Sequence, residues 1–197
     1  MEIPAALVKE LREKTSAGMM ECKAALQEAE GDLEKAVTIL RKRGLASAAR
    51  KAGRTTSEGI VSAYIHPGGK IGVLVELNCE TDFVARTDDF QQLVKDVAMH
   101  IAATDPKYVR RDEVTEDILE RERDVYREQA RQSGKPEAIL AKIVEGKVSR
   151  YFAENCLYDQ SFVKNPDTTV KEHIDSKIAT IKENISVKRF VRYKIGE

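Results

Sequence analysis

The sequence lacks a charge excess of either sign. Its 197 residues hold 33 Lys and Arg against 33 Asp and Glu, so the formal net charge at pH 7 is zero. Proteins that grip a phosphate backbone along their surface carry a basic excess. The balance therefore argues against wholesale binding of nucleic acid, and we expect no direct nucleic-acid partner.

Long apolar runs are also missing. No apolar stretch approaches the roughly 20 residues needed to cross a bilayer. The opening residues, Met1 to Pro4, have no basic segment followed by an apolar run, as a secretory signal would. We therefore expect a cytoplasmic protein with no membrane partner.

Cysteine is scarce, and no Cys-x-x-Cys pair is present. Cys22, Cys79 and Cys156 are odd in number and far apart, which predicts small buried thiols instead of zinc or redox chemistry. Asn155 beside Cys156 invites a thiol-nucleophile interpretation, but nothing in the sequence supplies the base and orienting group it needs. We predict no catalytic residue.

Metal-ligand and phosphate-binding spacings are absent too. His66, His100 and His173 lie in three different segments, without a His-x-x-x-His pair or a neighbouring cysteine. The glycines and lysine of residues 68–72 lack the Gly-x-x-x-x-Gly-Lys-Ser/Thr pattern and lead into a strand. We interpret them as a hairpin turn, and we predict no metal site and no cofactor.

The first 44 residues do carry three short helical patterns separated by glycine. Pro4 suits the first turn of one helix, Asp32 suits the N-cap of the third, and Gly44 would follow its last residue. The apolar positions recur at helical spacing: Leu7, Val8 and Leu11; Met19, Cys22, Leu26 and Ala29; Leu33, Ala36, Val37 and Leu40. This predicts a three-helix bundle, too small to enclose an active site and better suited to a surface role.

A basic stretch ends this bundle. Residues 45–56 are rich in alanine and read as a short helical linker, and no acid interrupts the basic residues from Arg41 to Arg54. Such a run could form a local nucleic-acid patch. Basic groups at a helix end more often complement the helix dipole.

A β-hairpin is predicted to open the next domain. Residues 61–65 alternate in polarity, Pro67 to Gly69 turn the chain, and residues 71–79 alternate on the return. Leu74 breaks this second alternation. We therefore expect both faces of the return strand to be at least partly covered.

Helices fill most of the remaining chain. Thr87 can cap a helix that Asp105-Pro106 ends, and the charged segment from Thr115 to Gln132 predicts a largely solvated helix. Pro136 begins a more apolar helix through Phe152. Thr169 can cap a further one.

The last residues, 185–195, alternate again and predict a third strand. About 100 residues separate it from the hairpin, so the sheet should be antiparallel or mixed, with helices on one side. The fold class predicted is α+β.

One aromatic side chain lies where folding alone would not place it. Phe83 falls after the predicted strand, on a polar turn between Asp82 and Arg86. A large apolar group on a loop tip usually fills either a local pocket or the pocket of a partner.

Three separated stretches resemble the elongation factor Ts family: Leu11 to Leu26, Glu76 to Arg86 and Asn184 to Phe190. The resemblance implies an N-terminal three-helix, ubiquitin-associated-like bundle followed by a core with a small three-stranded antiparallel sheet and packed helices. It also implies a GTPase-binding domain at residues 1–53, with its basic linker, and a core domain for dimerisation and exchange at residues 54–197.

The resemblance further implies a non-enzymatic guanine-nucleotide exchange factor of translation elongation. Such a protein binds elongation factor Tu carrying GDP and promotes GDP release by disturbing the magnesium and phosphate site, so that GTP can enter. In this family the segment matching Thr81, Asp82, Phe83 and Val84 intrudes on that site. The factor itself would bind no nucleotide.

A second contact with the GTPase is implied for the N-terminal bundle, around Met19, Met20 and Lys23. Methionine side chains adapt to irregular partner surfaces. Met19 lies on the apolar stripe of its helix, which favours packing inside the bundle. Met20 lies off the stripe and is the better contact candidate.

The length departs from that of longer family members, which carry a duplicated core half and a helical-hairpin insertion. Here 197 residues leave room for one core module. Short members pair as homodimers, so the resemblance implies a homodimer, with the strand near Val187 to Ile195 at its interface.

Two other functions stay open at this point. The three-helix bundle could recognise ubiquitin-like or other helical partners, with the second domain as a scaffold, although this leaves the match at Glu76 to Arg86 unexplained. An RNA-associated protein using Arg41 to Arg54 would bind RNA with a steep salt dependence.

Overall fold

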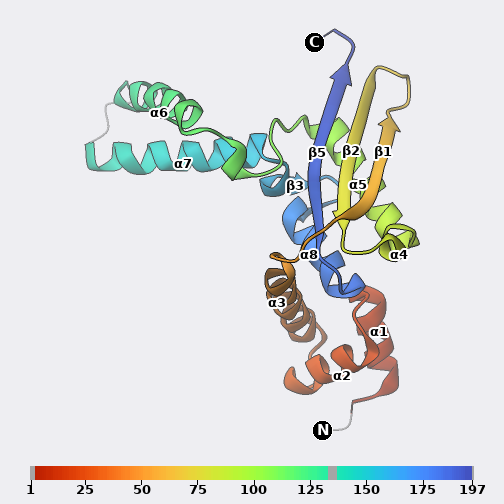
Figure 1. The fold of residues 1–197 in the computed structure, drawn as a ribbon. Coiled ribbons are helices and arrows are strands. Elements are labelled where there is room, and N and C mark those ends of the chain that lie inside the picture. The colour runs from red at the N-terminus through yellow and green to blue at the C-terminus, as the bar shows by residue number, and fades with distance from the viewer. Residues whose placement is uncertain (1–2, 133–136, 197) are drawn as a thin grey trace. The chain divides into compact units, whose positions relative to one another are not determined.

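The computed structural model describes residues 3–132 and 137–196, and it confirms the mixed α+β fold (Figure 1). The α-helices are α1 (Ala5–Thr15), α2 (Met19–Glu28), α3 (Leu33–Lys51), α4 (Asp82–Ala85), α5 (Asp88–Thr104), α6 (Glu116–Arg131), α7 (Glu137–Asn155) and α8 (Val170–Ile181). The strands are β1 (Glu58–Ile65), β2 (Ile71–Cys79), β3 (Ser161–Phe162), β4 (Asn165–Thr169) and β5 (Ile185–Lys194), and two short 3-10 turns are η1 (Arg111–Glu113) and η2 (Leu157–Asp159).

The chain divides into two compact units, each built from separated segments. The first comprises residues 1–61, 76–95 and 172–187. The second comprises residues 62–75, 96–171 and 188–197. A boundary between residues 53 and 54 stays a prediction.

Helices α1, α2 and α3 form the predicted bundle in the first unit. Their apolar faces share one core, which includes Val8, Leu11, Cys22 and Leu26. The third helix begins where the sequence indicates, because the Asp32 carboxylate accepts a hydrogen bond of 3.0 Å from the Lys35 backbone N–H. The predicted N-cap is therefore confirmed.

The prediction that the third helix ends before Gly44 is wrong, because α3 continues to Lys51. The residues after Gly44 are rich in alanine, the strongest helix former, which offsets the cost of roughly 1 kcal/mol for one interior glycine. A Cβ added at Gly44 would lie 3.4 Å from the Ala179 Cβ of α8. The glycine therefore allows close packing of helices instead of ending one.

Strands β1, β2 and β5 form the predicted three-stranded antiparallel sheet, in the order β1-β2-β5. The predicted turn between β1 and β2 is closed by a 2.9 Å hydrogen bond from the His66 N–H to the Ile71 carbonyl. Gly59 has φ +150°, and a Cβ there would lie 2.1 Å from the Leu77 carbonyl oxygen. Only glycine fits this approach of β1 to β2.

The outward face of the sheet is apolar and exposed. Val73 and Val75 are buried, but Leu74 between them is 47% exposed. The sequence predicted that both faces of β2 are at least partly covered, and at Leu74 the outward face is covered only in part. The break in alternation marks an apolar residue on this half-covered face.

Helix α5 begins and ends as the sequence indicates. The Thr87 hydroxyl accepts a 3.3 Å hydrogen bond from the Phe90 N–H, and Asp105 has φ +50°, which ends the helix before Pro106. In the second unit, Arg192 of β5 donates from Nε to the Ala102 carbonyl at 3.3 Å. This contact ties the end of α5 to the sheet.

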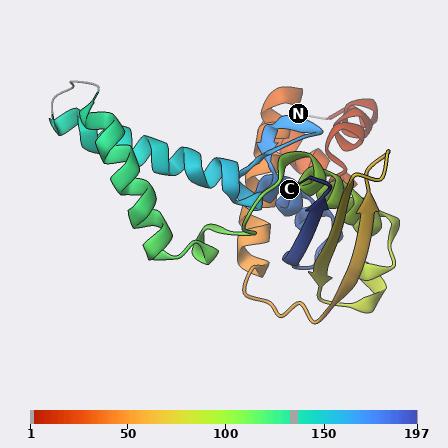
Figure 2. The same cartoon turned by 90° about the horizontal axis from the view of Figure 1, so that it is seen from above.

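Helices α6 and α7 lie side by side as a helical hairpin, which Figures 1 and 2 both show. Within the hairpin, Ala130, Val144 and Val148 form a small buried cluster, and Lys147 lies over the ring of Tyr126. Helix α6 buries only Leu119 and Ala130, so the predicted solvated helix is confirmed. Pro136, predicted to begin the second helix, lies outside the described residues.

A two-stranded sheet, β3 with β4, is not predicted from the sequence. Ser161 pairs with Thr169, and Phe162 pairs with Asn165. Strand β3 is too short for alternation to be read, and β4 is polar and contains Pro166. The helix that Thr169 was expected to cap, α8, begins at Val170.

All three cysteines are free and buried, as predicted. Burial raises the pKa of Cys79 and of Cys156 to about 11, so neither thiol is activated. Within residues 3–132 and 137–196, no helix is both long and apolar enough to span a membrane.

Candidate partner-binding site

The segment around Phe83 forms one turn of helix, α4, instead of the polar turn expected from the sequence. Thr81 caps it, since its hydroxyl accepts a 3.4 Å hydrogen bond from the Val84 N–H and its carbonyl accepts one of 3.3 Å from Ala85. A threonine N-cap is sufficient to start a helical turn where hydrophobic periodicity is too short to reveal one. The turn is therefore ordered by local hydrogen bonds.

Phe83 extends into solvent from this turn, with 76% of its surface exposed. Its neighbour Val84 points the other way and is 6% exposed, and Ala85 is buried as well. The four residues of the predicted contact therefore differ in exposure. Val84 holds the turn onto the protein, and Phe83 is presented outward.

Asp82 is exposed beside Phe83 and forms a weak ion pair with a nearby residue. The Arg86 guanidinium lies 2.8 Å from its carboxylate, four residues along the chain. Exposed pairs of this kind contribute about 0.2–1 kcal/mol. The carboxylate could therefore exchange Arg86 for another donor at low cost.

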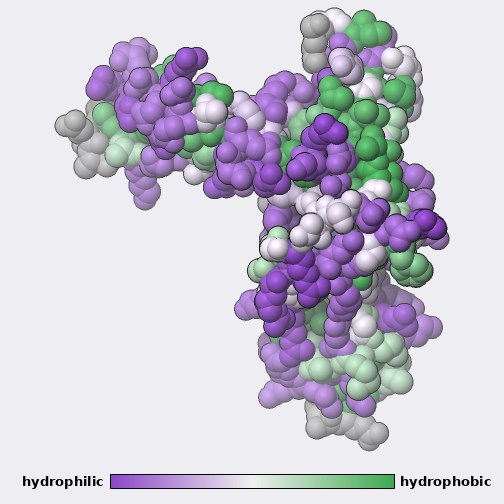
Figure 3. All heavy atoms as spheres, viewed as in Figure 1, coloured by the Kyte–Doolittle hydropathy of each residue, from purple (hydrophilic) through white to green (hydrophobic). Residues whose placement is uncertain are grey.

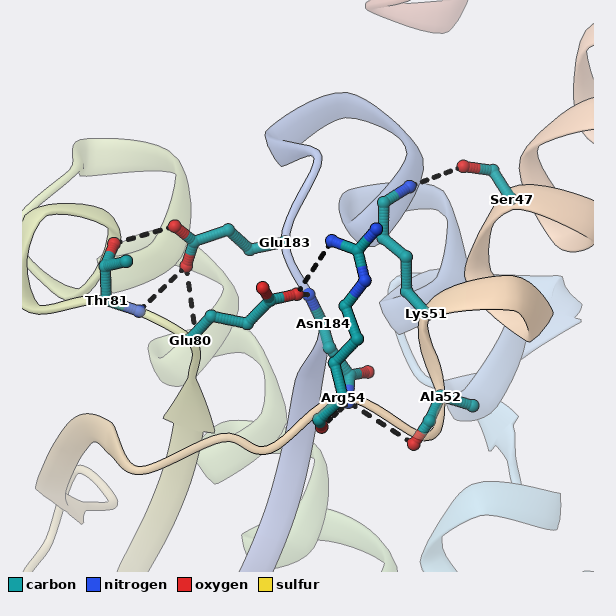
Figure 4. A network of polar contacts seen from close by, with 8 residues as sticks. All are labelled: Ser47, Lys51, Ala52, Arg54, Glu80, Thr81, Glu183 and Asn184. Atoms are coloured by element: carbon teal, nitrogen blue, oxygen red, sulfur yellow. Dashed lines mark hydrogen bonds and ion pairs between the residues drawn. The ribbon is translucent and has the colours of Figure 1, made fainter.

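Glu183, which follows α8, holds the start of this turn (Figure 4). Its Oε2 accepts hydrogen bonds from the backbone N–H groups of Glu80 and Thr81, at 3.1 and 3.0 Å. Its Oε1 accepts from the Thr81 hydroxyl at 2.7 Å. One carboxylate therefore fixes two backbone amides and one side chain immediately before Phe83.

The neighbouring residues extend this network to the end of α3 (Figure 4). The Glu80 carboxylate accepts from the Asn184 backbone N–H at 2.6 Å and from the Arg54 guanidinium at 3.4 Å. The Asn184 side chain donates to the carbonyls of Arg54 and Ala52, at 2.8 and 3.4 Å. Residues from three distant parts of the chain thus meet beside the turn.

The second candidate surface lies on α2. Met20 is 74% exposed and Lys23 is exposed, as a contact surface requires. Met19 is 45% exposed, so the expectation that it packs inside the bundle holds only in part. On the same helix, Glu21 accepts a 2.7 Å hydrogen bond from Lys182.

The basic stretch from Arg41 to Arg54 is largely engaged within the protein. Arg41 pairs with Glu172 at 2.7 Å, Arg43 pairs with Glu28, and Arg54 contacts Glu80. Lys51 donates to the Ser47 hydroxyl at 2.6 Å, and burial followed by repulsion from Lys182 lowers the pKa of Lys51. Arg41, Arg43, Lys51 and Arg54 of the basic run thus have partners within the protein, and those of Arg41 and Arg54 are distant in sequence.

The histidines also have local surroundings that suit structural roles. The His100 ring is buried and lies 2.9 Å from the Gln160 side-chain oxygen, and burial lowers the pKa of His100. His66 lies 3.2 Å from the Tyr64 hydroxyl. Among the residues that the structure describes, no group of three or more His, Cys, Asp and Glu side chains could hold a metal ion.

Comparison with known proteins finds relatives that match nearly the whole chain. The family described as Elongation factor TS matches residues 6–197. Elongation factor Ts of Geobacter metallireducens is 60% identical over 197 residues, covering all of this chain and 91% of that protein. Elongation factor Ts of Fervidobacterium nodosum is 58% identical over 197 residues, covering both chains completely.

The chain belongs to the elongation factor Ts family. This membership, which the resemblance in the sequence indicated, places it among the translation elongation factors of protein biosynthesis. The family match includes α2, the turn at Phe83 and residues 182–184. Phe83 and Met20 stand out in the sequence, but Glu183 does not. The only sequence signal near Glu183 is the adjoining stretch from Asn184 to Phe190.

Proposed function

We propose that this chain is a guanine-nucleotide exchange factor for elongation factor Tu. The exposed Phe83 on an ordered turn carries the proposal, together with family membership. The chain would bind the GTPase with GDP, promote GDP release and leave when GTP enters. It would act without catalytic residues and without a cofactor of its own, in the cytoplasm and without binding nucleic acid.

The proposed action of Phe83 is that of a wedge. A phenylalanine moved from water into a desolvated pocket contributes roughly 2 kcal/mol or more. Asp82 would offer its carboxylate to donors near the magnesium and phosphate site, exchanging Arg86 for them. Thr81 and Val84 would hold the wedge, the first as the N-cap and the second through its burial.

The energetics require further contacts. Exchange factor and GDP must weaken each other's binding by the same factor, because coupling between two sites is reciprocal. A loosening of about 10⁴-fold needs roughly 5.5 kcal/mol of differential binding. We propose that Met19, Met20 and Lys23, exposed on α2 of an N-terminal domain at residues 1–53, supply part of the remainder.

We also propose that the chain forms a homodimer through its core domain, residues 54–197. Hydrophobic residues gather over the strands in Figure 3. In the second unit this exposed apolar face comprises Ile65, Leu74, Val191, Tyr193 and Ile195. Apolar patches of this kind mark interaction surfaces in monomers, and a second copy would cover one here.

A fluorescence assay tests the exchange function. Elongation factor Tu loaded with a fluorescent GDP is mixed with excess unlabelled GDP, with and without this protein. Faster loss of fluorescence in its presence supports the proposal. Binding without acceleration would instead favour a simple binding module, and no binding would refute a role on this GTPase.

A further inference from the structure

The carboxylate of Glu183 accepts three hydrogen bonds from the start of the turn that carries Phe83 (Figure 4). Two of the donors are backbone N–H groups, at Glu80 and Thr81, and the third is the Thr81 hydroxyl. A charged acceptor makes shorter and stronger hydrogen bonds than a neutral one. The contact therefore fixes the backbone direction immediately before Phe83 more firmly than the cap of α4 alone can.

Residues 182–184, which follow α8, also reach the other candidate surface. Lys182 has φ +71°, and its ammonium group lies 2.7 Å from the Glu21 carboxylate on α2, while the Glu183 side chain contacts Thr81. Asn184 is anchored at the Glu80 carboxylate. Residues 182–184 thus connect the helix that presents Met20 with the turn that presents Phe83.

We infer that Glu183 is a positioning residue for nucleotide exchange, acting through Phe83 on elongation factor Tu. The inference rests on the proposed function. Phe83 has little contact with its own protein, so its direction depends on the backbone that carries it. A wedge is effective only when it enters its pocket with little loss of conformational freedom, and a fixed backbone reduces that loss.

A matched pair of substitutions tests this. Glu183→Gln removes the charge at nearly constant size, and Glu113→Gln does the same at a carboxylate that accepts a 2.8 Å hydrogen bond from the Val109 N–H. We expect Glu183→Gln to lower the maximal GDP-release rate about tenfold, the effect of losing a charge-assisted hydrogen bond. The half-saturating concentration should change less than about threefold, because the loss arises after binding. Glu113→Gln should leave the rate unchanged.

A double-mutant cycle separates positioning from a structural effect. If Glu183 acts through Phe83, Glu183→Gln should change the rate less than about twofold in a Phe83→Ala background. A full tenfold loss in that background, or no loss in the wild-type background, would overturn the inference. Thr81→Val, which removes one donor from the other side, serves as a second variant if Glu183→Gln unfolds. It should show the same dependence on Phe83.

Hydrogen exchange of the free protein gives a readout independent of elongation factor Tu. The Thr81 amide should be protected in the wild type, and its exchange should accelerate in Glu183→Gln but not in Glu113→Gln. Unchanged Thr81 protection would overturn the inference even if exchange activity is present. A wild-type protein that protects Thr81 but does not accelerate GDP release would instead refute the proposed function.

Discussion

The Lys182 ammonium group lies 2.7 Å from the Glu21 carboxylate, joining residues separated by 161 positions in the chain. The hydrogen bond from Lys182 lowers the pKa of Glu21, although burial acts in the opposite direction. Both side chains remain about half exposed. The contact therefore fixes where α2 meets the turn after α8 more than it stabilises the fold.

The pH dependence of stability should report this contact. Because its folded-state pKa is lowered, Glu21 stabilises the protein above its unfolded-state pKa and loses that effect as pH falls through the folded-state value. We expect Lys182→Met to lower the free energy of unfolding by less than about 1 kcal/mol at pH 7, and this difference should vanish as the pH falls through the lowered pKa of Glu21.

Urea unfolding across this pH range measures the difference. Lys9→Met is the control, since Lys9 pairs with exposed Glu13 at 3.9 Å, within one helix. A difference between wild type and Lys182→Met that persists at low pH would contradict an ionic origin.

Removing the ring of Phe83 should reduce exchange without affecting stability. The side chain is 76% exposed, so Phe83→Ala removes almost no packing from the free protein. A loss of roughly 2 kcal/mol in the complex corresponds to a GDP-release rate lower by about 30-fold. The fluorescent GDP assay measures this.

Thermal unfolding supplies the companion measurement for Phe83→Ala, which should keep the wild-type melting temperature. Val125→Ala is a matched control, because Val125 is also an exposed apolar residue on a helix. An unchanged exchange rate in Phe83→Ala would exclude the wedge.

Truncating the neighbouring Val84 should lower the stability of the free protein, unlike Phe83→Ala. Val84 is buried, so Val84→Ala removes packed methyl groups and should lower the free energy of unfolding by roughly 2 kcal/mol. Urea unfolding monitored by circular dichroism checks this. A loss as small as that of Phe83→Ala would mean that Val84 does not anchor the turn.

The outward face of the sheet should control self-association. A charge at its centre, as in Leu74→Lys, would have to be desolvated in a homodimer and should convert it to monomers. Sedimentation velocity measures the effect. Val163→Lys places the same charge at an exposed apolar residue outside this sheet and should leave a dimer intact. A wild-type monomer would refute the proposed interface.

Local patterns predicted the longer helices and the three main strands, because each depends on neighbours in sequence, but they did not predict the single turn of α4. Asp32 caps α3 and Thr87 caps α5 through contacts three residues away. Where two local preferences compete, contacts with distant residues decide whether a helix continues or ends. At Gly44 the alanine-rich continuation and packing against Ala179 extended the helix.

The candidate site was predicted only where a residue looked out of place. Phe83 did so because a large apolar side chain on a polar segment is unusual. Glu183 did not, since an acid among polar residues is ordinary, and its partner Thr81 is 102 positions away. Spacing rules do not reach such pairs, which arise only when the sheet brings β2 and β5 together.

Gly59 bears on the same segment from the other strand. Its missing side chain lets β1 approach the backbone at Leu77, a few residues before the turn that carries Phe83. Strand β2, which leads into α4, thus lies directly beside the main chain of β1 at that point, with no side chain between them. A protein surface that must push on a partner gains from such a rigid support. Here any side chain at residue 59 would force the two strands apart and weaken that support.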